Sequence, residues 1–272
     1  MAYTLYVGSL FSSFAHPYYI CKNWNMKPQV EVCFSPELYR HKLVKENFVV
    51  VVTDIFRATT SICAALNYGV KAVIPVSNRE DAKKYKEKGY IIACEQNGQT
   101  VDFADIGNSP SDFMKMDFRN KIIAFSTTNG TYAINLAKQD ADEVFIGSFI
   151  NLTALFKRLS AIGKNVVILC AAWKNLFNLE DSLFAGALSE LLIDSGEFES
   201  ECDSVKASID LWRIAKLDLQ GYLSKSSHRR RLKRLVSDDD YRFTLTLDAS
   251  NLAPTLKNGE IIVADALQTA GR

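Results

Sequence analysis

The chain has 272 residues and a formal net charge of +1, and it is 48% hydrophobic and 23% charged. This length can bury a substantial core, as one large α/β domain or as a main domain with a smaller appendage. The balanced charge excludes a bulk attraction to nucleic acid, and no segment approaches the ~20 apolar residues that a membrane-spanning helix needs.

The first segment, residues 1–25, is rich in aromatic side chains and has no Lys or Arg before Lys22. It therefore lacks the basic start of a secretory signal. Met26 then begins a segment typical of a chain that starts with a strand. We expect residues 1–25 to be an extension outside the core, from an upstream start site or as a tail, and not a targeting signal.

Apolar runs rich in Val and Ile, without polar alternation, predict strands that are buried on both faces of a sheet. They are Val30–Phe34, Phe48–Thr53, Ala72–Val76, Tyr90–Cys94, Lys121–Phe125, Glu143–Ile146 and Val166–Cys170. Helical patterns alternate with them, at Ala58–Asn67, Arg79–Lys88, Thr131–Lys138, Leu152–Ala161 and Leu179–Leu192. This alternation predicts a main domain over residues 26–196, a three-layer α/β/α fold with a largely parallel or mixed sheet.

The pattern changes after Gly196. A helix is expected over Ser204–Leu219, then a basic segment, and then a short strand pair, Phe243–Leu247 and Ile261–Ala264. We interpret residues 197–272 as a smaller α+β subdomain or cap that belongs to the same fold unit.

The six cysteines are scattered, without a CxxC pair, and none of the three histidines has a partner at metal-ligand spacing. Thiols inside strand-like runs behave as small apolar side chains. A zinc site is therefore not expected, and reduced cysteines indicate a cytoplasmic protein.

Polar turns follow many of the apolar runs. They are DIFRATT (Asp54–Thr60), CEQNG (Cys94–Gly98), DIGNSP (Asp105–Pro110), STTNGT (Ser126–Thr131) and NLED (Asn178–Asp181). Ligands of α/β sheets bind beyond the carboxyl ends of the strands. We therefore expect these turns to meet at one site.

The first of these turns combines Asp54 with Arg57. The carboxylate can hold Mg²⁺ or act as a base, and the guanidinium can grip a phosphate through two hydrogen bonds. The alternative is a structural ion pair at a helix start, with Asp54 as the cap. The residue types alone leave both interpretations open.

The other turns are open to a structural reading as well. Glu95 suits a hard cation, or it simply enters a polar loop; Asn108, Ser109 and Asn129 suit oxyanion binding or plain helix capping. Acidic residues at the start of Leu179–Leu192 are favourable through the helix dipole alone. The basic run from His228 to Arg234 is typical of a solvated helix face, or it attracts a polyanionic substrate.

The order of the motifs is more specific than any one of them. DIFRATTS, IPVS, CEQNG, DIGNSP, STTNGTYA, GSFIN and NLEDSLFAGAL together resemble the 2-phosphosulfolactate phosphatase family of coenzyme M biosynthesis. The resemblance runs from about Val30 to Leu192 and continues more weakly through SSHRRRL (Ser226–Leu232) and Asp238–Asp240. It implies a cytosolic Mg²⁺-dependent phosphatase that hydrolyses (2R)-2-phospho-3-sulfolactate, a small polyanion, to (2R)-3-sulfolactate and phosphate.

The chain departs from the family pattern in three places. Gln96 and Tyr132 stand where the resemblance implies arginines, and Trp173-Lys174-Asn175 replaces a glycine-rich turn. Lys174 and Arg229–Arg231 are the candidates to compensate. The departures favour two alternatives, namely a phosphatase for another small phosphorylated acid and a non-catalytic module that binds an anionic metabolite.

The chemistry and the resemblance together assign the site. Asp54 and Arg57 are the predicted catalytic residues, with Asp54 as a base or as the carrier of an aspartyl-phosphate. The predicted Mg²⁺ ligands are Asp54, Glu95, Glu180 and Asp181. The predicted substrate-binding residues are Thr59, Thr60, Asn108, Ser109, Thr128, Asn129 and Gly130. No nucleic acid or membrane partner is expected, and the oligomeric state stays open, a homo-oligomer included.

Overall fold

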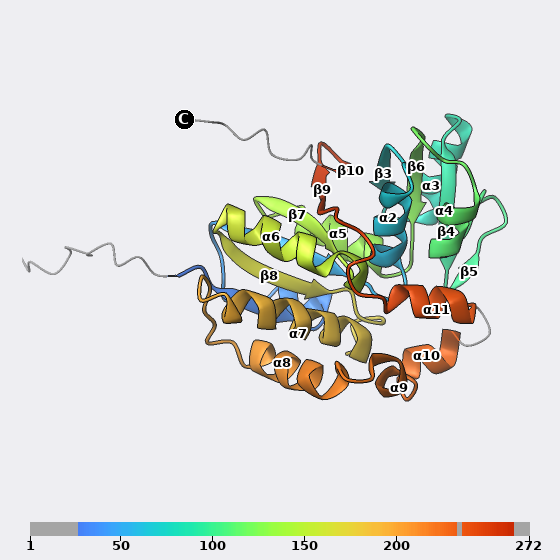
Figure 1. Cartoon of the computed structure of the whole chain (residues 1–272). Coiled ribbons are helices and arrows are strands. Elements are labelled where there is room, and N and C mark those ends of the chain that lie inside the picture. The colour runs from blue at the N-terminus through green and yellow to red at the C-terminus, as the bar shows by residue number, and fades with distance from the viewer. Residues whose placement is uncertain (1–26, 233–235, 264–272) are drawn as a thin grey trace, which may run out of the picture.

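The computed structural model describes residues 27–232 and 236–263, so the extension expected over residues 1–25 lies outside the described part of the chain. The described residues form an α/β fold around a ten-stranded sheet with helices on both faces (Figure 1). The predicted three-layer α/β/α class is therefore confirmed. Within these residues, no helix has both the length and the apolar character needed to cross a bilayer.

The sheet has the strand order β1-β8-β2-β7-β9-β10-β3-β6-β4-β5. The strands are β1 (Val30–Cys33), β2 (Phe48–Thr53), β3 (Ala72–Pro75), β4 (Ile91–Gln96), β5 (Gln99–Thr100), β6 (Ile122–Ser126), β7 (Glu143–Gly147), β8 (Asn165–Cys170), β9 (Pro254–Lys257) and β10 (Glu260–Val263). β1, β8, β2 and β7 pair in parallel, as do β3, β6 and β4. The antiparallel hairpin β9–β10 joins these two parallel halves.

Helices cover both faces of the sheet. They are α1 (Pro36–Tyr39), α2 (Ala58–Asn67), α3 (Arg79–Glu87), α4 (Pro110–Lys115), α5 (Gly130–Ala137), α6 (Leu152–Ile162), α7 (Leu179–Asp194), α8 (Asp203–Ala215), α9 (Leu219–Leu223), α10 (Ser227–Leu232) and α11 (Asp238–Thr244), with a 3₁₀ turn at Phe149–Asn151. α6, α7 and α8 pack on one face of the β1–β7 half, while α2 and α5 share one apolar cluster with strands of both halves. α3 covers the outer face of β4 and β6.

The strands are buried on both faces because their side chains are divided between two clusters. Val49 and Val51 of β2 belong to the cluster with α7, whereas Val50 and Val52 belong to the cluster with α2. This explains the unbroken apolar run that predicted β2. The described cysteines are free thiols, all buried except the half-buried Cys202.

One predicted element is wrong. The segment Phe243–Leu247 is not a strand, because α11 runs through Thr244. Ser237 is the N-cap of α11, and its side chain accepts a hydrogen bond from the N–H of Asp240. Three acidic residues occupy the first turn of the helix. Such a cap and favourable dipole interactions stabilise a helix start more than the short Phe-Thr-Leu alternation favours a strand.

The chain beyond residue 197 is divided between two places. α8 packs along α7, whereas β9 and β10 lie inside the main sheet, between β7 and β3. The predicted strand near Ile261 corresponds to β10. Its hairpin partner is β9, which starts at Pro254, and not the segment Phe243–Leu247.

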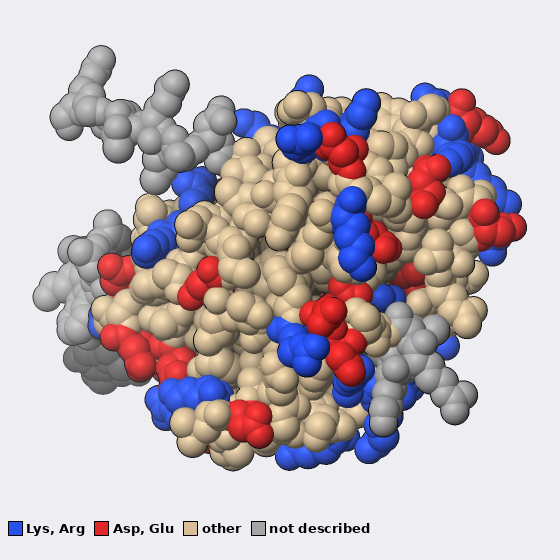
Figure 2. All heavy atoms as spheres, turned by 45° about the vertical axis from the view of Figure 1, so that its right-hand side comes forward, with Lys and Arg blue, Asp and Glu red and all other residues tan. Residues whose placement is uncertain are grey.

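Charges of both signs intermingle on the face shown in Figure 2, in keeping with the net charge of +1.

Candidate active site

The turn after β2 is closed by its own polar groups. The Asp54 N–H donates to Thr59 Oγ1 at 2.8 Å, and the Thr59 N–H donates to the Asp54 carbonyl at 3.1 Å. Thr60 Oγ1 donates to the carbonyl of Ile55 at 3.1 Å. These bonds start α2 directly after the strand and leave Asp54 and Arg57 at its N-terminus, 7% and 6% exposed.

A second helix begins at the same place. A Cβ atom on Gly130, the first residue of α5, would lie 2.3 Å from the Ala58 Cβ and 2.8 Å from Asp54 Oδ2. Only glycine permits this approach, because Cβ atoms do not come so close to other heavy atoms. The Asp54 carboxylate therefore lies where the N-termini of α2 and α5 meet, and the Ala58 N–H bonds to it. Helix N-termini favour negative charge.

We expect Gly130→Ala to lower both stability and phosphatase activity. The added methyl group must push α5 away from Ala58 and Asp54, and overpacking of this kind costs roughly 1–3 kcal/mol. Urea unfolding and phosphate release measure the two effects. Gly163→Ala is the control, because no atom lies within 4 Å of its added Cβ and its φ of +62° costs only local strain. Equal activity of the two variants would contradict the close approach.

Glu95, at the end of β4, organises the neighbouring loops. Its Oε1 accepts the N–H of Thr128 at 2.7 Å, and its Oε2 accepts the N–H of Gly98 at 2.5 Å. The Arg57 guanidinium donates to the carbonyl of Gly98 at 3.3 Å. Turns from β2, β4 and β6 thus meet through one carboxylate and one guanidinium, as the sequence predicted for the strand ends.

Asp181 joins two further strand ends to α7. Its Oδ1 accepts the N–H of Ile55 at 2.8 Å, and its Oδ2 accepts the N–H of Ala172 at 3.1 Å and the side-chain amide of Asn178 at 3.0 Å. The residue is fully buried. Asp181 therefore holds the turns after β2 and β8 at the start of α7.

Burial and acidic neighbours raise the pKa values of Asp54 and Asp181. Burial, together with Asp181 and Glu95, raises the pKa of Asp54 well above its usual range, although the Ala58 N–H opposes the shift. Burial and Glu180 raise the pKa of Asp181 to about 7. Burial lowers the pKa of Arg57, against the favourable charges of Glu95, Asp240 and Asp54. The site concentrates negative charge that a cation would neutralise.

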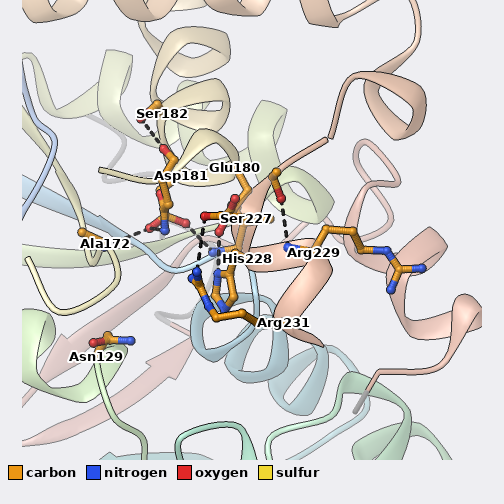
Figure 3. A network of polar contacts seen from close by, with 12 residues as sticks. Asn129, Ala172, Glu180, Asp181, Ser182, Ser227, His228, Arg229 and Arg231 are labelled. Atoms are coloured by element: carbon orange, nitrogen blue, oxygen red, sulfur yellow. Dashed lines mark hydrogen bonds and ion pairs between the residues drawn. The ribbon is translucent and has the colours of Figure 1, made fainter. Parts of the chain in front are cut away.

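His228 is a site residue that the sequence reasoning missed. Its Nδ1 lies 2.5 Å from Glu180 Oε1, and both side chains are buried (Figure 3). The His228 ring packs against Phe56 and Trp173, with centroid distances of 5.9 and 5.4 Å. The histidine stands in SSHRRRL, but it has no partner at zinc-ligand spacing, and the basic run around it is typical of a solvated helix face. α10 instead turns this histidine inward.

The predicted substrate-binding residues fall into two groups. Thr59 and Thr60 are fully buried, and their hydroxyls bond within the turn or to Ser148. Ser109 Oγ donates to Asp240, and Asn129 Oδ1 accepts the N–H of Lys174 at 3.3 Å.

The remaining three are Asn108, Thr128 and Gly130, and Thr128 Oγ1 accepts the N–H of Asn97 at 3.0 Å. The buried Asn108 Oδ1 has no partner within the described residues. Thr128 lines a cavity, and Gly130 borders Asp54. A substrate-binding role stays a prediction for all seven residues.

A cavity of about 510 Å³ opens beside Glu95 at the carboxyl ends of β3, β4 and β6. Its lining residues are Ser77, Asn78, Arg79, Glu80, Lys83, Cys94, Glu95, Gln96, Val101, Ser126, Thr127 and Thr128. This volume is large enough for a three-carbon acid. The cavity shares Glu95 and Thr128 with the loops that contact Arg57.

The four predicted Mg²⁺ ligands differ in what their oxygens already bind. Glu95 and Asp181 use both carboxylate oxygens for protein N–H groups. Glu180 Oε1 contacts His228, whereas its buried Oε2 has no partner in the described part of the chain. Asp54 borders the helix N-termini. Free oxygens for a metal therefore remain on Asp54 and Glu180.

Two oxygens close in the chain to Asp54 and Glu180 are of a kind that a hard cation binds. Thr53 Oγ1 and Asn178 Oδ1 are also buried without partners among the described residues, and Mg²⁺ takes oxygen ligands. Within residues 27–232 and 236–263, no three His, Cys, Asp or Glu side chains are grouped to hold a metal. Mg²⁺ does not need such a group, because it uses one or two carboxylates with water and substrate phosphate. The metal assignment stays a prediction.

Comparison with known proteins identifies the family. The family described as 2-phosphosulpholactate phosphatase matches residues 33–259, which include every turn of the candidate site. The chain belongs to this family. A relative from Caldanaerobacter subterraneus subsp. tengcongensis, named probable 2-phosphosulfolactate phosphatase, is 38% identical over 220 residues, covering 79% of this chain and 90% of its own.

More distant relatives bear the same name. The proteins from Thermotoga petrophila and Clostridium acetobutylicum are 34% and 29% identical, over 79% and 86% of this chain and 92% and 100% of their own. The resemblance inferred from the order of the motifs is therefore confirmed. The family match extends past α7 to residue 259, so it includes His228 and α11 as well.

The residues that depart from the pattern implied by the resemblance lie in different environments. Gln96 lines the cavity, whereas Tyr132 is 44% exposed and its hydroxyl accepts a hydrogen bond from Arg40 at 3.2 Å. Lys174 lies over the ring of Trp173, and so does Arg231. Of the two positions where the resemblance implies an arginine, Gln96 therefore lies in the cavity and Tyr132 lies outside it.

Proposed function

We propose that this protein is a Mg²⁺-dependent phosphatase of the cytoplasm that hydrolyses (2R)-2-phospho-3-sulfolactate to (2R)-3-sulfolactate and phosphate. One observation supports it most. Asp54 and Arg57 lie together, nearly buried, at the N-terminus of α2, where α5 also begins. Family membership and the relatives' names agree with this chemistry, and the product would serve the synthesis of a sulfonate such as coenzyme M.

The protein groups have separate tasks in this proposal. Arg57 donates to phosphoryl oxygens, and the amides at the start of α5 add N–H donors where charge develops during transfer. Asp54 receives the proton of the attacking water, for which a raised pKa is suitable. Asp181 and Glu95 do not react; they hold the turns of β2, β4, β6 and β8 at the required separation.

Asp54 and Glu180, with water, would hold Mg²⁺. When bound, the ion would neutralise phosphoryl oxygens and lower the pKa of water. Glu180 is ordered by His228, so the imidazole is a positioning group for this carboxylate.

Removal of the metal is the direct test of this part. Dialysis against EDTA is expected to abolish phosphate release, and Mg²⁺ is expected to restore it. Added Mg²⁺ should also raise the melting temperature of the wild type, because a ligand that binds only the folded state stabilises it. In Asp54→Asn the rise should be smaller or absent. Full activity after EDTA treatment would refute the Mg²⁺ requirement.

A second function is favoured by Gln96 in the cavity, namely hydrolysis of another small phosphorylated acid. A panel separates the possibilities: 2-phospho-3-sulfolactate, phospholactate, phosphoglycerate and glycerol 2-phosphate, each with Mg²⁺. Release from the sulfonate alone supports the first proposal, and preferred release from another acid supports the second. Binding without any turnover would show a non-catalytic homologue.

A further inference from the structure

The outer wall of the cavity is formed by the first turns of α3. Arg79 and Lys83 both line the cavity, and a spacing of four residues puts them on one face of the helix. The Arg79 Cζ and the Lys83 Nζ each lie 5.4 Å from the centroid of the Phe103 ring. Two cations are thus held one turn apart beside an open cavity, where an anion between them would reduce their mutual repulsion.

The acidic residues near the cavity offset the positive charge of Arg79 and Lys83 only in part. Glu95 accepts two main-chain N–H groups, which offset its charge. Arg79 contacts Asp102 at 2.7 Å, but Asp102 is 81% exposed and solvent screens this pair. Lys83 forms no ion pair with any residue that the structure describes. Glu80 is the remaining acidic lining residue, and it is exposed.

Thr127 lies between the cavity and Asp54. Thr127 lines the cavity, and its Oγ1 lies 3.3 Å from the point where a Cβ on Gly130 would be. The same point is 2.8 Å from Asp54 Oδ2. Asp54 is therefore a near neighbour of a residue that lines the cavity, and a substrate whose phosphate lies at Asp54 and Arg57 would reach the cavity past Thr127.

We propose that this cavity binds the second acidic group of the substrate, a sulfonate or a carboxylate, and that Arg79 and Lys83 are the residues that recognise it. The inference rests on the proposed phosphatase activity and names the groups that distinguish the substrate from a simple phosphomonoester. The two cations of α3 supply the positive charge that the loop lacks at Gln96, which lines the same cavity.

The test compares two substrates that differ only in their side arms. Arg79→Gln, Lys83→Gln and the double variant are assayed with 2-phospho-3-sulfolactate and with glycerol 2-phosphate, which carries its phosphate on the central carbon between two neutral arms. Loss of one charge-assisted contact is expected to lower kcat/KM for the sulfonate about tenfold or more, mainly through KM. Glycerol 2-phosphate should be hydrolysed equally by all variants. Lys88→Gln, at the other end of α3 and outside the cavity, is the matched control and should behave as wild type.

A binding measurement separates this inference from the phosphatase proposal. Sulfoacetate and malonate are titrated calorimetrically into wild type and the double variant; tighter binding of one shows which acid the cavity prefers. Weaker binding to the double variant supports the cavity even if the wild type hydrolyses no phosphate ester, in which case only the phosphatase proposal fails. Unchanged binding of both probes, or equal losses on both substrates, would overturn the role of Arg79 and Lys83.

Discussion

Phosphate release by Asp54→Asn is expected to fall by about 10³-fold, while the protein stays folded. The substitution removes the proposed base and a proposed metal ligand, and general-base catalysis alone is worth roughly 10²–10⁴ in rate. The melting temperature of the metal-free protein should rise, because burial, and then repulsion by Asp181 and Glu95, disfavour the charged Asp54 carboxylate. A gain in stability with a loss of activity is typical of a functional site.

Two variants complete this experiment. Asp142→Asn makes the same chemical change at a surface residue that pairs with Lys164, and it should alter neither activity nor melting temperature. Arg57→Ala should lower phosphate release by orders of magnitude through loss of phosphate binding. Colorimetric phosphate assays and thermal unfolding by circular dichroism provide the two measurements. Near-wild-type turnover by both Asp54→Asn and Arg57→Ala would refute the site.

Asp181→Ala is expected to cause the largest loss of stability, roughly 3–5 kcal/mol in the free energy of unfolding. The side chain is fully buried and accepts hydrogen bonds from the N–H groups of Ile55 and Ala172 and from Asn178. Alanine leaves all three donors buried without an acceptor, and each such donor costs about 1–3 kcal/mol. The turns after β2 and β8 should separate from α7.

Urea denaturation measures this loss. Asp181→Asn retains one acceptor oxygen, so its stability should lie between those of the wild type and the alanine variant. Asp194→Ala, at the exposed end of the same helix, should stay within about 0.5 kcal/mol of wild type. Unfolding free energies that do not follow this order would show that Asp181 does not hold the strand ends together.

The main elements were predictable because their signals are local. β2 and α2 have the predicted bounds, since an unbroken Val run followed by an Ala- and Thr-rich segment has few alternatives. Asn78 caps α3 by accepting the N–H of Asp81, a contact within four residues of the chain. The strand predicted at Phe243–Leu247 failed because the residues that start α11 precede it. A helix start there depends on Ser237 and its acidic neighbours, which the apolar pattern does not include.

The sequence predicted the location of the candidate site at the strand ends, but not the contacts between its side chains. Asp54, Arg57 and Glu95 do come together, because the carboxyl ends of parallel strands share one edge. The contact of His228 with Glu180 joins residues 48 positions apart, and no spacing rule relates them. Arg79 and Lys83 appeared in the sequence only as part of an ordinary charged helix face.

The sequence by itself determined the family and the alternation of strands and helices, and it predicted that the polar turn from Asp54 to Thr60 belongs to the candidate site. The tertiary structure decided what each polar group does. It joined two parallel half-sheets through β9 and β10, turned Asp181 and Glu95 toward main-chain N–H groups, and left the cations of α3 beside the cavity. The reason is physical: periodicity and capping act within a few residues, whereas hydrogen-bond partners and burial depend on segments that meet only in the folded chain.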